Sequence, residues 1–284
     1  MKHKKWKKSE VIVAVLLDLV GIVAIVALSG ILLEYMGGNA SYKDLEKYVI
    51  LPDEQEELSA AEEEHATNNG QIGQNEGADD AGGGETAAKV VHYGQCPQVD
   101  FASLRVLNSD VVGWIYGPGT RINYPVVQGT DNSFYLTHMF DGKENKCGSI
   151  FMDSLNNMDF SNTNSVLHGH HMKNGSMFAS LTEYESQEYY DSHPVLWLAT
   201  PEKSYQVEIF TGFVTDVDSE AWQIEFATKE EYKNWLGQMK ERGMFECDVI
   251  PETGDQILTL ATCSYKYDDA RFVVMGIMRE VSAE

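Results

Sequence analysis

Two residues near the C-terminal end of the chain have the types and the spacing that nucleophilic chemistry needs. Cys263 ends the run "ILTLATC" at 257–263, and Arg271 opens the run "RFVVMG" after a polar segment. Both runs are rich in β-branched and apolar residues and predict strands, so the segment between them is expected to be a loop. A strand–loop–strand unit would bring Cys263 and Arg271 close together. The pattern alone leaves two interpretations open: a nucleophile with its electrostatic partner, or a buried structural cysteine with a surface arginine.

A nucleophilic cysteine needs a nearby base or positive charge, because only about 3% of a thiol with an ordinary pKa near 8.5 is ionised at pH 7. The segment "SVLHGHHMKNG" supplies His168, His170 and His171 at the end of another expected strand. His168 and His170 would lie on the same side of an extended segment, as two metal ligands do. No HExxH or carboxylate motif supplies the remaining ligands of a zinc site. A Cys-His-Arg site built from three strand ends is compatible with the pattern, and a structural role is the alternative for each histidine.

Short strands dominate the chain from about Cys96 onward and would have to position these side chains. They lack the regular strand–helix alternation of a parallel α/β fold, which favours a closed or nearly closed β-barrel with helices attached. Two helices are expected, at 100–108 from the spacing of the apolar residues and at 228–243 from a Thr228-x-x-Glu231 capping box. The other expected strands are at 111–116, 123–127, 148–152, 164–168, 195–199 and 204–214.

The N-terminal part of the chain has the composition of a membrane anchor followed by a stalk. A basic tail at 1–10 precedes an apolar run at 11–33, which as a helix is long enough to cross a hydrocarbon core of roughly 30 Å. The lysines before this run predict that the N-terminus is cytoplasmic and the rest extracellular. A cleaved signal peptide is the alternative, because 27–29 reads Ala-Leu-Ser. Residues 34–94 are expected to form an acidic stalk, partly helical and then disordered, and 95–284 a globular domain.

Charge and cysteine content exclude some classes of partner and leave others open. The formal net charge of −23 disfavours nucleic acid, because its phosphates would be repelled. The four cysteines are spaced without a CxxC zinc pairing. A domain of this length can build a core without disulfides, so the disulfide status of Cys96, Cys147 and Cys247 stays open.

The motif "TLATC", followed by an arginine at the start of the next strand, resembles the signature of the sortases. The segments 99–153 and 164–181 look like the corresponding stretches of class B sortases, as does the helical insertion around 218–243. The similarity extends over nearly all of residues 95–284, which would be the catalytic domain. It implies a mainly β fold: a closed eight-stranded sortase-type barrel with N-terminal helices and a helix inserted between two barrel strands.

The resemblance also implies roles for the residues that match the family's motifs. Cys263 would be the nucleophile, His170 the general acid and base, and Arg271 the residue that stabilises the oxyanion and positions the peptide. His170 is selected because the family's catalytic histidine directly follows a glycine and has a methionine two residues later. His171 matches a position that varies between His and Asn, and His168 one that is commonly Tyr, so both are expected to have structural or supporting roles.

Five further positions are expected to bind substrate by the same resemblance. Asn132 and Leu136 match positions that line the peptide groove, and Val217 and Trp222 match the loop before the inserted helix. Packing is the alternative for Trp222. Ala261 stands where the family often has serine, so a hydroxyl contact to substrate would be absent.

The resemblance implies a surface transpeptidase of a Gram-positive bacterium, anchored by a single membrane pass with its catalytic domain outside. It would cleave a C-terminal sorting motif after Thr and join the surface protein, through a thioacyl intermediate, to a peptidoglycan amine or its lipid-linked precursor. No cofactor, metal or nucleic acid is expected. The alternatives are a pilin polymerase with a lysine acceptor, a papain-like protease and a non-catalytic surface scaffold.

Overall fold

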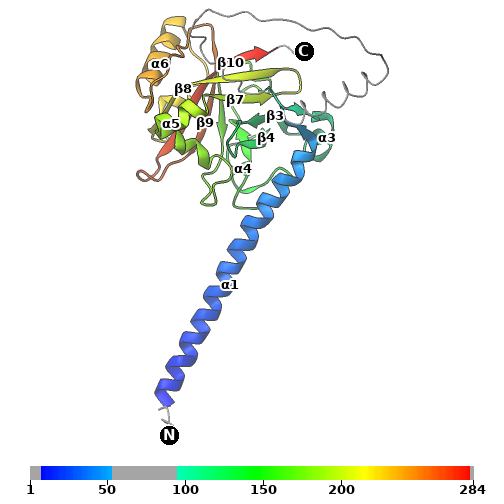
Figure 1. The fold of residues 1–284 in the computed structure, drawn as a ribbon, viewed down its shortest axis with the longest axis vertical. Coiled ribbons are helices and arrows are strands. Elements are labelled where there is room, and N and C mark those ends of the chain that lie inside the picture. The colour runs from blue at the N-terminus through cyan, green and yellow to red at the C-terminus, as the bar shows by residue number, and fades with distance from the viewer. Residues whose placement is uncertain (1–7, 53–94, 282–284) are drawn as a thin grey trace, which may run out of the picture.

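The computed structural model describes residues 8–52 and 95–281, and most of the second range belongs to a β-barrel (Figure 1). The barrel is closed, with its eight strands in the order β10-β8-β7-β3-β4-β5-β6-β9. The predicted closed eight-stranded barrel with flanking helices is therefore confirmed. The barrel strands are β3 (Val111–Tyr116), β4 (Asn123–Val127), β5 (Ile150–Met152), β6 (Asn164–His168), β7 (Val195–Ala199), β8 (Ser204–Thr215), β9 (Gln256–Cys263) and β10 (Arg271–Val281).

Strand direction decides which strand ends meet. The pairs β4–β5 and β6–β9 are parallel, and the other neighbouring pairs are antiparallel. Because β6 and β9 run in the same direction, the strand ends that carry His168 and Cys263 lie at the same end of the barrel. The antiparallel strand β10 begins there with Arg271, which pairs directly with Cys263. Three strand ends that carry chemically competent residues therefore meet.

The two faces of β10 are buried in different places, which explains its continuous apolar sequence. Phe272 and Val274 belong to the main core inside the barrel. Val273, Met275 and Ile277 belong to a second cluster together with apolar residues of α6 (Lys229–Glu241). A strand covered on both faces needs apolar residues at successive positions.

Helices and short turns surround the barrel, and two of the helices begin with side-chain caps, of which the sequence predicts the one at Thr228. Asp100 accepts a hydrogen bond from the Ser103 amide at the start of α3, and Thr228 accepts one from the Glu231 amide at the start of α6. The remaining elements are α1 (Lys8–Leu45), η1 (Glu46–Tyr48), β1 (Val49–Ile50), β2 (Gln98–Val99), α3 (Phe101–Leu107), α4 (Phe134–Thr137), η2 (Ala179–Glu185), α5 (Gln187–Ser192) and η3 (Glu220–Trp222).

The long helix α1 extends away from the barrel and meets it at its C-terminal end (Figure 1). There Tyr42 is buried and its hydroxyl donates to the Gly148 carbonyl at 2.6 Å. The following strand β1 pairs with β2. Residues 42–50, which the composition assigns to the stalk, therefore pack against the domain.

Two expectations concern the N-terminal part of the chain: a membrane anchor and a disordered stalk. Among the residues that the structure describes, none of the helices is apolar over a length that would cross a membrane. The Gly-rich, acidic part of the stalk, within 53–94, lies outside the described residues.

Candidate active site

Cys263 and Arg271 are neighbours across the β9–β10 ladder, as the sequence predicts. They form a direct cross-strand pair, so their side chains start from adjacent points on the sheet. The Nη1 group of Arg271 donates to the carbonyls of Asp269 and Ala270, at 3.2 and 3.1 Å. These two bonds fix the guanidinium beside the thiol at the mouth of the β9–β10 loop.

His170 lies next to Cys263 because the chain continues beside β9 just past the end of β6, where the Gly169 amide donates to the Ala261 carbonyl at 3.0 Å. A Cβ atom at Gly169 would lie 2.5 Å from Ile150 Cδ1 and 2.7 Å from Phe178 Cδ2, so only glycine lets the chain pass there. The Nε2 atom of His170 lies 2.6 Å from the Leu136 carbonyl. Because a carbonyl only accepts, Nε2 carries the proton, and Nδ1 is left for the thiol. The imidazole forms a side-chain hydrogen bond with Cys263.

The electrostatics of this pair favour its charged form. The hydrogen bond from His170 lowers the pKa of the Cys263 thiol below its ordinary value, burial opposes this shift, and the charge of Arg271 adds to it. The hydrogen bond with Cys263 raises the pKa of His170, burial opposes this shift, and the Leu136 carbonyl adds to it. Both shifts increase the fraction of thiolate paired with imidazolium at neutral pH.

His171 supports the backbone of the same strand end. Its Nδ1 atom lies 3.1 Å from the Cys263 carbonyl, and its ring packs on Tyr265 with centroids 5.0 Å apart. The Tyr265 hydroxyl donates to the His171 carbonyl. His171 therefore holds the Cys263 backbone and the β9–β10 loop together without contacting the thiol.

The structure brings some of the expected substrate-binding residues to the catalytic end and buries one. Leu136 is 38% exposed and contacts His170 through its carbonyl. Val217 is 40% exposed, and its carbonyl accepts a hydrogen bond from Trp222 Nε1 at 2.8 Å. Ala261 is buried in the barrel wall, 3% exposed, between His168 on β6 and Val273 on β10.

Asn132 and His168 are joined by an aspartate that the sequence did not single out. Asp153 follows β5 directly, and its Oδ2 atom lies 3.1 Å from His168 Nε2 and accepts from Asn132 Nδ2 at 2.8 Å. His168 also packs near Trp222, with ring centroids 6.1 Å apart. The available signal was a carboxylate at the end of a short apolar run, the same kind of position that drew attention to Cys263.

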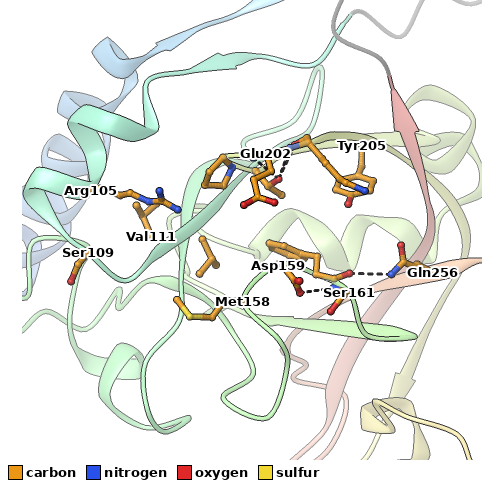
Figure 2. A pocket seen from close by; sticks show the side chains of 14 residues that line it. Arg105, Ser109, Val111, Met158, Asp159, Ser161, Glu202, Tyr205 and Gln256 are labelled. Carbon is orange, nitrogen blue, oxygen red and sulfur yellow. Dashed lines mark hydrogen bonds between the residues drawn. The ribbon is translucent and has the colours of Figure 1, made fainter.

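A pocket of about 420 Å³ (Figure 2) lies near the start of β9, at the opposite end of the barrel from Cys263. Gln256, which lines it, begins β9, whereas Cys263 ends that strand. The side chains of Arg105, Asp159 and Glu202 also line it, and Gln256 donates to the Phe160 carbonyl. This hollow and the reactive side chains are thus separated by the length of a strand. Within residues 8–52 and 95–281, no cluster of three or more His, Cys, Asp or Glu side chains could hold a metal ion.

The cluster of thiol, imidazole and guanidinium is suited to acyl transfer. A thiolate can attack a peptide carbonyl, an imidazolium can protonate the leaving amine, and a guanidinium can stabilise the oxyanion that forms between these steps.

Comparison with known proteins agrees with this chemistry. A family model described as a sortase domain matches residues 115–279. Sortase B of Staphylococcus aureus is 34% identical over 184 residues, which are 64% of this chain and 75% of that protein. The structure of a Staphylococcus aureus sortase B–substrate complex superposes with a TM-score of 0.62 at 34% identity, covering 64% of this chain and 85% of that one. A structure of sortase B complexed with triglycine gives 0.61 at 34% identity, covering 64% and 86%.

The matched residues run from the barrel strand β3 to the last strand β10 and include all three members of the cluster. The chain belongs to the sortase family, within class B, and is a cysteine transpeptidase.

Proposed function

We propose that Cys263, His170 and Arg271 carry out the transpeptidation, with a C-terminal sorting motif of a surface protein as acyl donor. The observation that supports this most is the position of Cys263, which pairs with Arg271 across the ladder and shares a hydrogen bond with His170. The Cys263 thiolate attacks the carbonyl carbon of the motif's threonine and forms a tetrahedral oxyanion. The oxyanion collapses to a thioester between Cys263 and the threonine, and the peptide bond after threonine breaks.

His170 moves the proton in both halves of the reaction. Its imidazolium gives a proton to the departing amine, which leaves as a neutral group. In the second half, an acceptor amine attacks the thioester, His170 takes the proton that the amine loses, and Cys263 leaves as a thiolate. The Leu136 carbonyl holds the Nε2 proton in place, so Nδ1 is the atom that exchanges protons with the substrate.

Arg271 stabilises the oxyanion of both tetrahedral intermediates. Its Nη1 group is committed to the carbonyls of Asp269 and Ala270, which leaves the other edge of the fork-shaped guanidinium for the substrate oxygen. A donor that is fixed before the reaction needs no reorganisation when the negative charge develops.

We propose a peptidoglycan amine, or that of its lipid-linked precursor, as the acceptor. The complexes of similar sortase B proteins with a substrate and with triglycine support a peptide donor and an amine acceptor for this chain. The apolar run at 11–33 and the lysines before it support a single membrane pass, with the N-terminus in the cytoplasm and the barrel outside. Carbonate extraction of cell envelopes tests this: an anchored chain stays in the membrane fraction, and a chain released into the wash contradicts the anchor.

The reaction is tested with the purified full-length protein and peptides carrying NPQTN, SPKTG or LPETG motifs, with and without a diamino acid or oligoglycine. Mass spectrometry follows the products. We expect cleavage after threonine, an adduct on Cys263, and a new amide when the acceptor is present. Cys263→Ala should abolish all three, whereas the matched variant Cys96→Ala should retain them. If the wild-type protein leaves all three peptides uncleaved, the proposal that a sorting motif is the acyl donor is contradicted.

A further inference from the structure

The proposed transpeptidation makes no use of His168, although this residue lies two positions before His170. His168 occupies the last position of β6. Its ring lies near those of Phe151, with centroids 5.2 Å apart, and Trp222, with centroids 6.1 Å apart. The hydrogen bond to Asp153 orients the imidazole, with Nε2 directed at the carboxylate.

Asp153 collects hydrogen bonds from three segments. Its Oδ2 atom faces His168 Nε2 and accepts from Asn132 Nδ2, and its Oδ1 atom accepts from the Leu155 amide at 3.0 Å. Burial opposes ionisation of Asp153, but the hydrogen bonds from His168, Leu155 and Asn132 lower its pKa. The carboxylate is therefore a charged acceptor, and charged acceptors form the stronger hydrogen bonds.

These contacts fix the orientation of the Asn132 amide. Asp153 can only accept and so selects the nitrogen end, and the Ser154 amide donates to Asn132 Oδ1 at 2.7 Å and so selects the oxygen end. An asparagine amide has two N–H donors and two lone pairs on its oxygen. One donor and one lone pair are used inside the protein, which leaves one of each on an exposed residue. The remaining N–H donor and oxygen lone pair of Asn132 match the acceptor and donor of a peptide group.

We propose that His168 and Asp153 are positioning residues that orient the Asn132 amide to bind the backbone of the sorting peptide. The proposal rests on the proposed function, because it assigns the ligand of Asn132 to the same peptide. It makes the contribution of His168 to peptide affinity dependent on Asn132. It also links Asn132 to the segment before α6, because His168 packs near Trp222 of that segment.

Two substitutions separate the hydrogen bond of His168 from its packing. His168→Phe keeps a ring against Phe151 and Trp222 but removes the donor to Asp153. We expect it to raise KM for the sorting peptide about tenfold, the size expected when a hydrogen bond to a charged group is lost, with a much smaller change in kcat. A change in KM alone is typical of binding that is equal in the ground and transition states. His168→Gln places an N–H near the position of Nε2 and should keep KM within about twofold of wild type.

A double-mutant cycle with Asn132→Ala decides whether His168 acts through Asn132. If it does, His168→Phe changes KM in the wild-type background and has little further effect in the Asn132→Ala background. Asp153→Asn serves as the second variant if His168→Phe is poorly folded, and it should show the same dependence. Leu155→Ala is the matched control, because its exposed side chain lies on the same loop while its backbone contact to Asp153 remains.

The outcomes separate the two proposals. If the wild type cleaves its peptide but His168→Phe leaves KM unchanged, or raises it equally with and without Asn132, the positioning role is overturned and the transpeptidase proposal stands. If His168→Gln behaves like His168→Phe, the donor is irrelevant and the positioning role is again overturned. If the wild type cleaves no sorting peptide, both proposals fall.

Discussion

Reactivity at the residue scale depends on how far three side chains shift one another's protonation. Cys263 shares a hydrogen bond with His170 and faces the charge of Arg271 across the ladder, and both effects lower its pKa. His170 is pushed in the opposite direction by the same hydrogen bond. The thiolate therefore persists to lower pH than in an ordinary cysteine, and the imidazolium persists to higher pH than in an ordinary histidine. The rate of thioacyl formation should be bell-shaped in pH, with two apparent pKa values that belong to the coupled pair of Cys263 and His170.

The pH dependence of Cys263 alkylation by iodoacetamide measures the first of these shifts. Followed by peptide mass spectrometry, its midpoint should lie below the ordinary pKa of a cysteine thiol. His170→Ala should move the midpoint upward more than Arg271→Ala does, because the histidine hydrogen bond is the largest cause of the shift. Cys96 is an internal comparison, since burial raises its pKa to about 11. A midpoint at or above the ordinary pKa of a cysteine thiol, or the reverse order of the two variants, contradicts the assigned causes.

Arg271 contributes geometry as well as charge, and Arg271→Lys separates the two. Lysine keeps the charge but cannot bond two loop carbonyls through one nitrogen and present a second nitrogen to the oxyanion. We expect the single-turnover rate of thioacyl formation to fall by roughly a hundredfold or more, the usual cost of losing one oxyanion donor. Arg279→Lys, on the same strand but paired with Glu208 and Asp255, should leave the rate near wild type. A fully active Arg271→Lys would mean that positive charge alone is sufficient.

At the scale of elements, the segment after β6 requires a glycine and the helix α6 does not. Gly169 has no room for a Cβ atom, whereas Gly237 on α6 has nothing within 4 Å. Gly169→Ala should lower the free energy of unfolding by about 1–3 kcal/mol through overpacking and displace His170 from the thiol. Gly237→Ala should raise it by about 0.5–1 kcal/mol, because glycine is unfavourable inside a helix. Denaturant unfolding of both variants checks the signs of these changes in unfolding free energy. An unchanged stability of Gly169→Ala would contradict the close packing around Gly169.

The segment that follows α6 is held by one lysine of that helix. Lys240 Nζ donates to the carbonyls of Cys247 and Val249 at 2.9 and 3.0 Å and lies 2.7 Å from Cys247 Sγ. Lys240→Met keeps most of the aliphatic stem and leaves these acceptors without their charged donor. Unfolding experiments should show a loss of roughly 1–3 kcal/mol, while Lys233→Met, at an exposed position of the same helix, should be close to neutral. Equal stabilities of the two variants would show that solvent replaces the lysine.

The strands and their bounds could be predicted from sequence because alternating and continuous apolar runs record which faces are buried. The segments 111–116, 123–127, 164–168 and 195–199 are strands at those limits. The ends of β9 and β10, and with them the pair Cys263 and Arg271, followed from the same reasoning. The link from His168 through Asp153 to Asn132 could not be predicted, because it depends on side-chain orientations at the end of one strand and in two loops. Its residues are polar and carry no periodic signal.

For the whole molecule, the boundary between stalk and domain was predicted from composition. Composition does not reveal single residues that attach a charged segment to the domain. The segment 42–50 carries four charged residues among its apolar ones, yet Tyr42 and Val49 are buried against the domain. These contacts join the end of α1 to the loop that leads into β5. Helix α1 therefore ends on the barrel itself, and movement of the helix end would be transmitted to residues 148–152, next to Asp153.

Tyr42→Phe tests this connection, because it removes only the hydroxyl that donates to the Gly148 carbonyl and contacts Ser149 Oγ at 3.0 Å. The ring would stay packed edge-to-face on Tyr124, so the expected loss is the hydrogen-bond part alone, about 1 kcal/mol of unfolding free energy. Hydrogen exchange should rise at the amides of 145–150 and in the last turn of α1, and stay unchanged in β9 and β10, which the hydroxyl does not touch. Tyr48→Phe is the matched control at the neighbouring turn. If exchange rises across the whole barrel, the α1 end is an integral part of the core; if it rises nowhere, the helix rests on the barrel without being fixed to it.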